Sequence, residues 1–332
     1  MGAHPTRRGF LKSTGALALL AAACSRTGPG PASGSGPVTV THVFGETTVP
    51  APPTRVVSAG LTEQDDLLAV GVIPIAVTNW FGDQPFGVWP WAQDRLDGAE
   101  PVVLSIEDGI QVDEIGRLTP DLIVAVNGGL DADTYRALSA IAPTIAQSGG
   151  EAFFEPWREQ ASAVATAVFK RDEMDRILRD VDERFAAIGQ ANPQLRDRTA
   201  VLLDGRLDAG AATATVAGWR TDFLTAMGLR VPDNLSALAS GDGTAVIAGD
   251  DLASATASAD VLIWCTDSDA ERDALLADPA VAGLDNTAQG AAAQGRNVFT
   301  TGDLAAAIAF ASPLSYPVVA GQLPALVARA LD

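Results

Sequence analysis

The chain has 332 residues, of which 47% are hydrophobic, and its formal net charge at pH 7 is −19. Residues 1–23 hold three of the 22 basic residues and none of the 41 acidic ones, so the remainder carries a net charge of −22. A surface this acidic repels phosphate backbones and argues against nucleic acid as a partner. The roughly 300 residues that follow are too many for one small core and indicate two lobes.

The first 24 residues have the three-part order of an export signal. Arg7, Arg8 and Lys12 form a charged segment, residues 16–23 form an apolar segment, and Cys24 follows three alanines. The apolar segment is too short to span a bilayer as a helix. We therefore predict that residues 1–23 are a signal peptide.

Two short motifs in this segment predict the export route and the anchor. Residues 6–12 resemble the twin-arginine export motif. Residues 20–24 resemble a lipoprotein box, although Ala21 stands where a larger aliphatic residue is usual. We expect acylation of Cys24, and a plain cleaved signal with an incidental cysteine is the alternative. Residues 24–37 are rich in Gly, Pro and Ser and predict a flexible tether, so the lipid is the only membrane contact that we expect.

The pattern after the tether begins with a hairpin over residues 38–49 and continues as short apolar runs that alternate with helical segments. Apolar runs without in/out alternation, separated by helices, are typical of a parallel sheet covered on both faces. In the first half, strands are predicted at 55–59, 75–78, 102–106, 122–127 and 144–146, and helices at 63–70, 112–118 and 132–141. The arrangement then restarts, with strands at 200–203, 213–216, 261–265 and 298–300 and helices at 222–227, 250–255, 271–277 and 317–331.

One long amphipathic helix separates the two halves. Apolar residues recur at intervals of three and four between Met174 and Ile188. A helix over residues 170–189 would be about 30 Å long at 1.5 Å per residue. We predict an N-terminal α/β lobe at 38–168, an interlobe helix at 169–190 and a C-terminal α/β lobe at 191–332.

Several kinds of chemistry are absent from the sequence. His4 lies in the signal, so His42 is the only histidine left for a catalytic triad or a zinc site. No nucleophile-elbow motif follows a predicted strand, which argues against an exported hydrolase. Cys265 lies in an apolar run and is expected to be a buried, unpaired core residue. Asp65 and Asp66 are expected on a solvated helix face.

Several motifs follow one another with a characteristic order and spacing. They are residues 54–60, Thr62-Glu63, residues 67–77, the block 113–124 with its Leu-Thr-Pro-Asp-Leu-Ile core, and the weaker segments 223–229 and 312–315. Together they resemble the solute-binding lipoproteins of iron–siderophore ABC importers, a helical-spine class that also contains vitamin B12 and haem binders. The resemblance covers roughly residues 50–332.

The resemblance implies a class III periplasmic-binding-protein fold and a role in transport. That fold has two α/β lobes with mainly parallel sheets flanked by helices and joined by one long α-helix. The implied function is capture of a ferric siderophore, without catalysis, cofactor or directly bound metal, by a monomer that delivers it to an ABC permease. Because only Tyr135 and Tyr316 exist, phenol contacts are scarce, and we favour a hydroxamate over a catecholate or haem. Haem or cobalamin as cargo and a structural or adhesive lipoprotein remain alternatives.

Ligands of open parallel sheets collect beyond the carboxyl ends of the strands, and that rule selects the candidate contacts. An aromatic loop follows the second strand of the first half, and a Trp-Arg pair follows a strand of the second half. Aromatic faces and a planar guanidinium suit a bulky anionic chelate. A loop folded over its own small core and an exposed charge at a helix start are the alternatives. The candidate contacts are Trp80, Phe81, Phe86, Trp89, Asn127, Arg206, Trp219 and Arg220.

Family members present one carboxylate from each lobe to basic pockets of the permease. The matching positions in this chain are Asp113, with Glu114 beside it, and Asp250 or Asp251. Acidic residues that complement the dipole at the start of a helix are the alternative explanation for Asp250 and Asp251.

Overall fold

The computed structural model describes residues 36–149, 153–241, 243–286 and 296–332. The predicted signal peptide, Cys24 and most of the predicted tether lie outside these residues. Within them, no helix is both long and apolar enough to cross a membrane.

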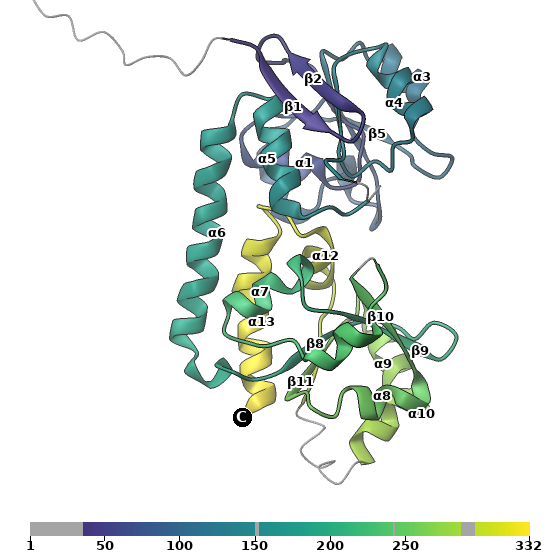
Figure 1. Ribbon diagram of the computed structural model, residues 1–332, viewed down its shortest axis with the longest axis vertical. Coiled ribbons are helices and arrows are strands. Elements are labelled where there is room, and N and C mark those ends of the chain that lie inside the picture. Colours follow the sequence, from purple (N-terminus) through teal and green to yellow (C-terminus); the bar gives the residue numbers. More distant parts are fainter. Residues whose placement is uncertain (1–35, 150–152, 242, 287–295) are drawn as a thin grey trace, which may run out of the picture. The chain divides into compact units, whose positions relative to one another are not determined.

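The fold starts with an antiparallel hairpin and a five-stranded parallel sheet (Figure 1). The sheet has the order β5-β4-β3-β6-β7. Its strands are short and mostly buried without alternation, because helices cover both faces. The strands are β1 (Val38–His42), β2 (Gly45–Val49), β3 (Val56–Ser58), β4 (Ala76–Thr78), β5 (Val102–Leu104), β6 (Leu122–Ala125) and β7 (Thr144–Ala146).

The helices of the first half connect these strands. Its α-helices are α1 (Glu63–Ala69), α2 (Pro90–Gln93), α3 (Val112–Arg117), α4 (Ala132–Ser139) and α5 (Trp157–Ala167). Two 3-10 turns, η1 (Pro85–Gly87) and η2 (Asp94–Leu96), lie in the aromatic loop that follows β4.

The second sheet has the order β10-β9-β8-β11-β12 and is mixed. Strands β8, β11 and β12 are parallel, whereas β9 is antiparallel to both of its neighbours. The sequence pattern did not predict β10, and it did not reveal the antiparallel direction of β9. The strands are β8 (Ala200–Asp204), β9 (Ala211–Thr215), β10 (Thr244–Ala248), β11 (Val261–Cys265) and β12 (Asn297–Phe299).

Short helices surround this sheet, and one longer helix, α13, follows it. The α-helices are α7 (Asp222–Ala226), α8 (Gly249–Ala255), α9 (Asp269–Ala277), α10 (Pro279–Ala282), α12 (Asp303–Phe310) and α13 (Tyr316–Leu331). The 3-10 turns are η3 (Pro193–Leu195), η4 (Trp219–Thr221), η5 (Asp233–Leu238) and η6 (Gly283–Asn286).

Helix α6 (Arg171–Ala191) connects the two halves and contributes to both cores. Figure 1 shows it running from the half that holds the first sheet to the half that holds the second. Met174 is buried in the core of the first half, whereas Val181 and Phe185 are buried in the core of the second. The predicted long connecting helix is therefore confirmed, together with the two-lobed α/β fold.

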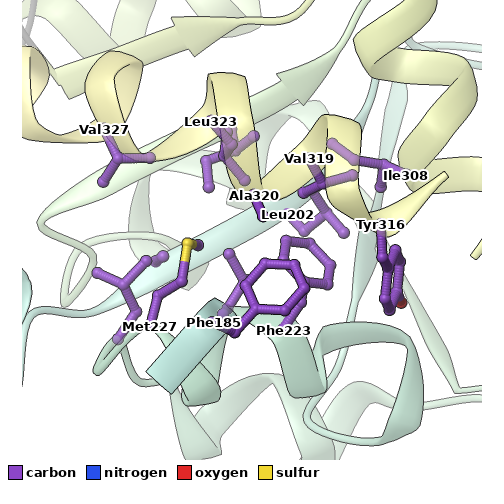
Figure 2. Close-up of a cluster of buried hydrophobic side chains, with 14 of the residues drawn as sticks. Phe185, Leu202, Phe223, Met227, Ile308, Tyr316, Val319, Ala320, Leu323 and Val327 are labelled. Atoms are coloured by element: carbon purple, nitrogen blue, oxygen red, sulfur yellow. The ribbon is translucent and has the colours of Figure 1, made fainter. Parts of the chain in front are cut away.

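The core of the second half is built around α13 (Figure 2). Tyr316, Val319 and Leu323 of this helix face Phe185 of α6 and Phe223 of α7. Each of these five side chains is at most 2% exposed. At roughly 2 kcal/mol for each large apolar side chain removed from water, such a cluster fixes α6 and α13 against the second sheet.

Candidate ligand-binding site

A cavity of about 290 Å³ lies beyond the carboxyl ends of strands from both sheets. From the first half it is lined by residues that follow β3, β4, β6 and β7, namely Thr62, Trp80, Asn127, Phe154, Glu155, Trp157 and Gln160. From the second half it is lined by the ends of β8, β9 and β11, by η4 and by α12, namely Leu202, Asp204, Thr215, Trp219, Arg220, Cys265, Ala305, Ile308, Ala309, Phe310 and Ala311. A concave, mainly aromatic and aliphatic wall with a few polar groups is typical of a small-molecule site.

Four of the eight predicted ligand contacts line this cavity. They are Trp80, Asn127, Trp219 and Arg220. The ring of Trp80 lies 5.1 Å from that of Phe154 and 5.5 Å from that of Phe310, measured between centroids. Aromatic residues from both halves therefore meet at one wall.

The Arg220 guanidinium lies over two of the aromatic rings. Its central carbon is 4.7 Å from the ring centroid of Trp219 and 5.1 Å from that of Phe154, which is within cation–π range. Trp219 and Arg220 come after β9, which runs antiparallel to β8. They reach the cavity because Thr215, the last residue of β9, pairs with Leu202 of β8. We selected Trp219 and Arg220 by the rule that ligands collect beyond the carboxyl ends of parallel strands. They do line the cavity, although their strand, β9, is antiparallel and the rule does not apply to it.

The other four predicted contacts are not among the residues that line the cavity. Phe81 contacts the rings of Trp80, Trp89 and Phe310. Trp89 is only 7% exposed and stacks on Trp91 with an interplanar angle of 4°.

Phe86 and Arg206 are also not among the lining residues. Phe86 packs against the small buried cluster that contains Val77 and Val88. Arg206 lines a separate, smaller hollow with Glu271 and Asp278.

Helix α1 carries three buried carboxylates close to the cavity. Glu63, Asp65 and Asp66 are each fully buried, so the expectation that Asp65 and Asp66 form a solvated helix face is wrong. Every residue of α1 is buried beneath neighbouring elements, so this helix has no solvated face. Burial raises the pKa of Glu63 to about 7 and that of Asp65 to about 6. Burial also raises the pKa of Asp66 well above its ordinary value.

These carboxylates are held by hydrogen bonds to the cavity wall and its supports. The backbone N–H of Asn127 donates to Glu63 Oε1 at 2.6 Å. Gln160 Nε2 donates to Asp66 Oδ2 at 2.7 Å and to Thr62 Oγ1 at 3.0 Å. Asn127 Nδ2 also donates to Thr62 Oγ1, at 3.1 Å. The polar side chains Thr62, Asn127 and Gln160 are therefore fixed before any ligand arrives.

Sequence reasoning missed several residues of the wall. Phe154, Glu155 and Trp157 line the cavity from the segment that precedes and begins α5. The adjacent aromatic pair Phe153-Phe154 was an available signal, because aromatic residues are concentrated there after a Gly-Gly loop. Cys265, expected inside the core, instead lies at the end of β11, lines the cavity and is partly exposed.

The predicted docking carboxylates lie at the starts of two short helices. Asp113 is exposed in the first turn of α3, and Glu114 forms an ion pair with Arg117. Asp250 and Asp251 are exposed in the first turn of α8. No group of three or more His, Cys, Asp or Glu among the described residues could hold a metal ion.

Comparison with known families decides the class of protein. A family model described as periplasmic binding protein matches residues 56–303. The chain belongs to the periplasmic binding protein family. Members of this family bind solutes and are not enzymes.

Two curated relatives match part of the chain. The putative ABC transporter substrate-binding lipoprotein YhfQ of Bacillus subtilis is 31% identical over 174 residues, covering 52% of this chain and 53% of that protein. The Fe(3+) dicitrate-binding periplasmic protein FecB of Escherichia coli is 28% identical over 194 residues, covering 58% of this chain and 62% of that protein. The chain thus spans less than two thirds of the length of the curated relatives it matches.

Solved structures of binding proteins match nearly the whole fold, and two of them illustrate the range of identity. A periplasmic solute binding protein from Mycobacterium smegmatis is 59% identical with a TM-score of 0.83, covering 90% of this chain and 99% of that chain. Streptococcus pneumoniae PiaA in complex with ferrichrome is 22% identical with a TM-score of 0.72, covering 89% of this chain and 98% of that chain.

Proposed function

We propose that this protein captures a ferric siderophore, preferably of the hydroxamate type, in the cavity between its two lobes. The observation that carries the proposal is a wall where the Arg220 guanidinium lies over the rings of Trp219 and Phe154. On the same wall, the ring of Trp80 contacts those of Phe154 and Phe310. Ring faces pack against the apolar backbone of such a chelate, while a guanidinium donates to oxygens that surround the metal. The relatives described as binding Fe(3+) dicitrate and ferrichrome support the same class of ligand.

The charges on the wall favour a hydroxamate over a catecholate. A ferric trihydroxamate core is neutral, whereas a ferric tricatecholate core carries three negative charges. The wall holds two carboxylates, Glu155 and Asp204, and one guanidinium, Arg220. A trianion would be repelled in a partly desolvated site of this composition. None of the described lining residues is Tyr or His, which also disfavours axial ligation of haem iron.

A titration of tryptophan fluorescence tests this function. Trp80, Trp157 and Trp219 line the cavity, so a bound iron chelate would quench their emission. Ferric hydroxamates, ferric catecholates, haem and cobalamin would each be added to the purified chain. We expect saturable quenching by a hydroxamate. An absence of response to every chelate would contradict a transport role, while a response to haem or cobalamin alone would move the assignment to those ligands.

We further propose that the protein delivers its ligand to an ABC permease from the outer face of the cytoplasmic membrane. In this proposal residues 1–23 direct twin-arginine export, Cys24 carries the lipid, and residues 24–37 form the tether. A tethered monomer raises the effective concentration of captured ligand at the permease. The Bacillus subtilis relative, described as an ABC transporter substrate-binding lipoprotein, supports both the anchor and the transporter. The lobes would span 38–168 and 191–332, joined by the helix at 169–190, and the exposed acids Asp113 and Asp251 would contact the permease.

A further inference from the structure

Glu155 lines the cavity, and one oxygen of its buried carboxylate has no hydrogen-bond partner among the described residues. It lies between β7 and α5 and is 5% exposed. Its Oε2 accepts hydrogen bonds from the backbone N–H of Ser148 at 2.6 Å and from the Ser148 hydroxyl at 2.8 Å. Its Oε1 has no hydrogen-bond partner within residues 36–149, 153–241, 243–286 and 296–332. The carboxylate is thus held from one side, with an acceptor left for another molecule.

The neighbouring polar side chains do not supply this missing donor. Thr62, Asn127 and Gln160 use their donors on one another and on Asp66. Because the great majority of buried polar atoms in proteins are paired, an unpaired carboxylate oxygen on a side chain that lines a cavity points to a ligand donor.

The charges near Glu155 favour a cationic donor. No described basic side chain forms an ion pair with Glu155. Its electrostatic neighbours are all acidic, namely Glu63, Asp66 and Glu159. Burial raises the pKa of Glu155 above its ordinary value. Elsewhere on the wall, burial raises the pKa of Asp204, while Arg206 and Arg220 act in the opposite direction. Asp204 thus has basic neighbours, whereas the charged group that acts on Glu155 is the acidic Glu159.

We propose that Glu155 determines specificity by accepting a hydrogen bond from a cationic amine on the siderophore. This inference rests on the proposed function and narrows its ligand to a ferric hydroxamate that carries an ammonium group. A neutral amide N–H would satisfy Oε1 but would leave the buried charge unpaired, whereas an ammonium does both.

Two chelates that differ only in this charge test the proposal. Ferrioxamine B is a ferric trihydroxamate with one free ammonium, and acetylation of that amine gives a neutral chelate with the same iron core. Dissociation constants of both would be measured for the unmodified chain, for Glu155→Gln and for Glu159→Gln. In Glu155→Gln the amide oxygen still accepts from Ser148, so the local fold is kept. Glu159→Gln removes a nearby exposed negative charge that does not line the cavity.

We expect the unmodified chain to bind ferrioxamine B about 10- to 100-fold more tightly than the acetylated chelate, as a charge-assisted hydrogen bond implies. Glu155→Gln should bind both chelates equally, while Glu159→Gln should keep the preference. Equal binding of both chelates by the unmodified chain, or a preference that survives in Glu155→Gln, would overturn the role of Glu155. Tight binding without preference would leave the proposed function standing. Failure of every ferric hydroxamate to bind would contradict both.

Discussion

The side chain of Asp65 in helix α1 accepts a hydrogen bond from the hydroxyl of Ser312, which lies 247 positions later in the chain. The same oxygen, Oδ2, accepts from Trp91 Nε1 at 2.8 Å. Ser312 follows Ala311, a cavity-lining residue just after α12. One buried carboxylate therefore connects the first half of the fold, its aromatic loop and the segment of the second half that borders the cavity.

Asp65→Ala should lower the free energy of unfolding by about 2–4 kcal/mol, because it leaves the Trp91 N–H and the Ser312 hydroxyl buried without an acceptor. Asp65→Asn keeps an acceptor oxygen, so it should lower the free energy of unfolding by less than Asp65→Ala does. Urea denaturation measures both values, and Asp133→Ala, which breaks only an exposed ion pair with Arg136, serves as the control. An alanine variant as stable as the unmodified chain would show that this contact does not connect the two halves energetically.

Glu63 should make the protein more stable in mild acid than at slightly alkaline pH. Its pKa is about 7 in the folded state against an ordinary value of 4.5. The folded state therefore binds the proton of Glu63 more tightly than the unfolded state does. The resulting contribution to the free energy of unfolding is fully present below about pH 4.5 and is lost as the pH rises through about 7. Between about pH 5 and about pH 8 the loss should be on the order of 2 kcal/mol.

The measurement compares the unmodified chain with Glu63→Gln at these two pH values by urea denaturation. Glutamine still offers an oxygen to the Asn127 N–H but does not titrate, so the pH dependence should shrink by that amount. Asp65 and Asp66 also have raised pKa values, so the free energy of unfolding of Glu63→Gln should still fall somewhat as the pH rises. An unchanged pH dependence in Glu63→Gln would mean that Glu63 titrates alike in the folded and unfolded states.

Substitutions of Trp89 and Trp219 should have different effects, the first mainly on stability and the second mainly on ligand binding. Trp89 is buried against Trp91 and Phe310, so Trp89→Ala should lower the free energy of unfolding by about 3–5 kcal/mol. Trp219 is partly exposed on the cavity wall, so Trp219→Ala should weaken siderophore binding about 10- to 100-fold with a smaller effect on stability. Thermal unfolding and fluorescence titration of both variants make the comparison. The opposite pattern would place the ligand against Trp89 instead of Trp219.

Reversing the charges at Asp113 and Asp251 should abolish siderophore uptake by cells while leaving the affinity for ligand unchanged. Both residues are exposed and neither lines the cavity, so only a contact with another protein should suffer. Asp180→Lys combined with Glu183→Lys makes the same change of charge on the exposed face of α6 and is the control. Normal uptake by the Asp113→Lys, Asp251→Lys double variant would remove the docking assignment.

Local patterns in the sequence were sufficient to predict most of the fold. The apolar stripe from Met174 to Ile188 predicted α6 to within two residues at each end, because it follows the helical repeat and ends just before Pro193. Strand β10 was missed because Val246 faces solvent and the strand alternates between buried and exposed residues, unlike the fully buried runs that were used as the signal.

The site could be predicted only in part, because tertiary packing decides which loop residues reach it. Trp80 and Trp89 have the same local signature, yet one lines the cavity and the other stacks on Trp91. Asp65 and Asp66 carry a charge pattern typical of a surface helix, and only the contacts with Ser312, Trp91 and Gln160 explain their burial. Such partners lie from about 25 to nearly 250 positions away in the chain, beyond the reach of a local pattern.

The central claim is that a ferric siderophore occupies the cavity bordered by Trp80, Trp219 and Arg220. The most direct measurement is a crystal structure of the chain with a ferric hydroxamate, recorded at the iron absorption edge so that anomalous scattering locates the metal. We expect one iron peak inside this cavity, with chelate oxygens toward Arg220 and apolar portions against the two tryptophans. An iron peak elsewhere on the protein, or an empty cavity at saturating chelate, would contradict this claim.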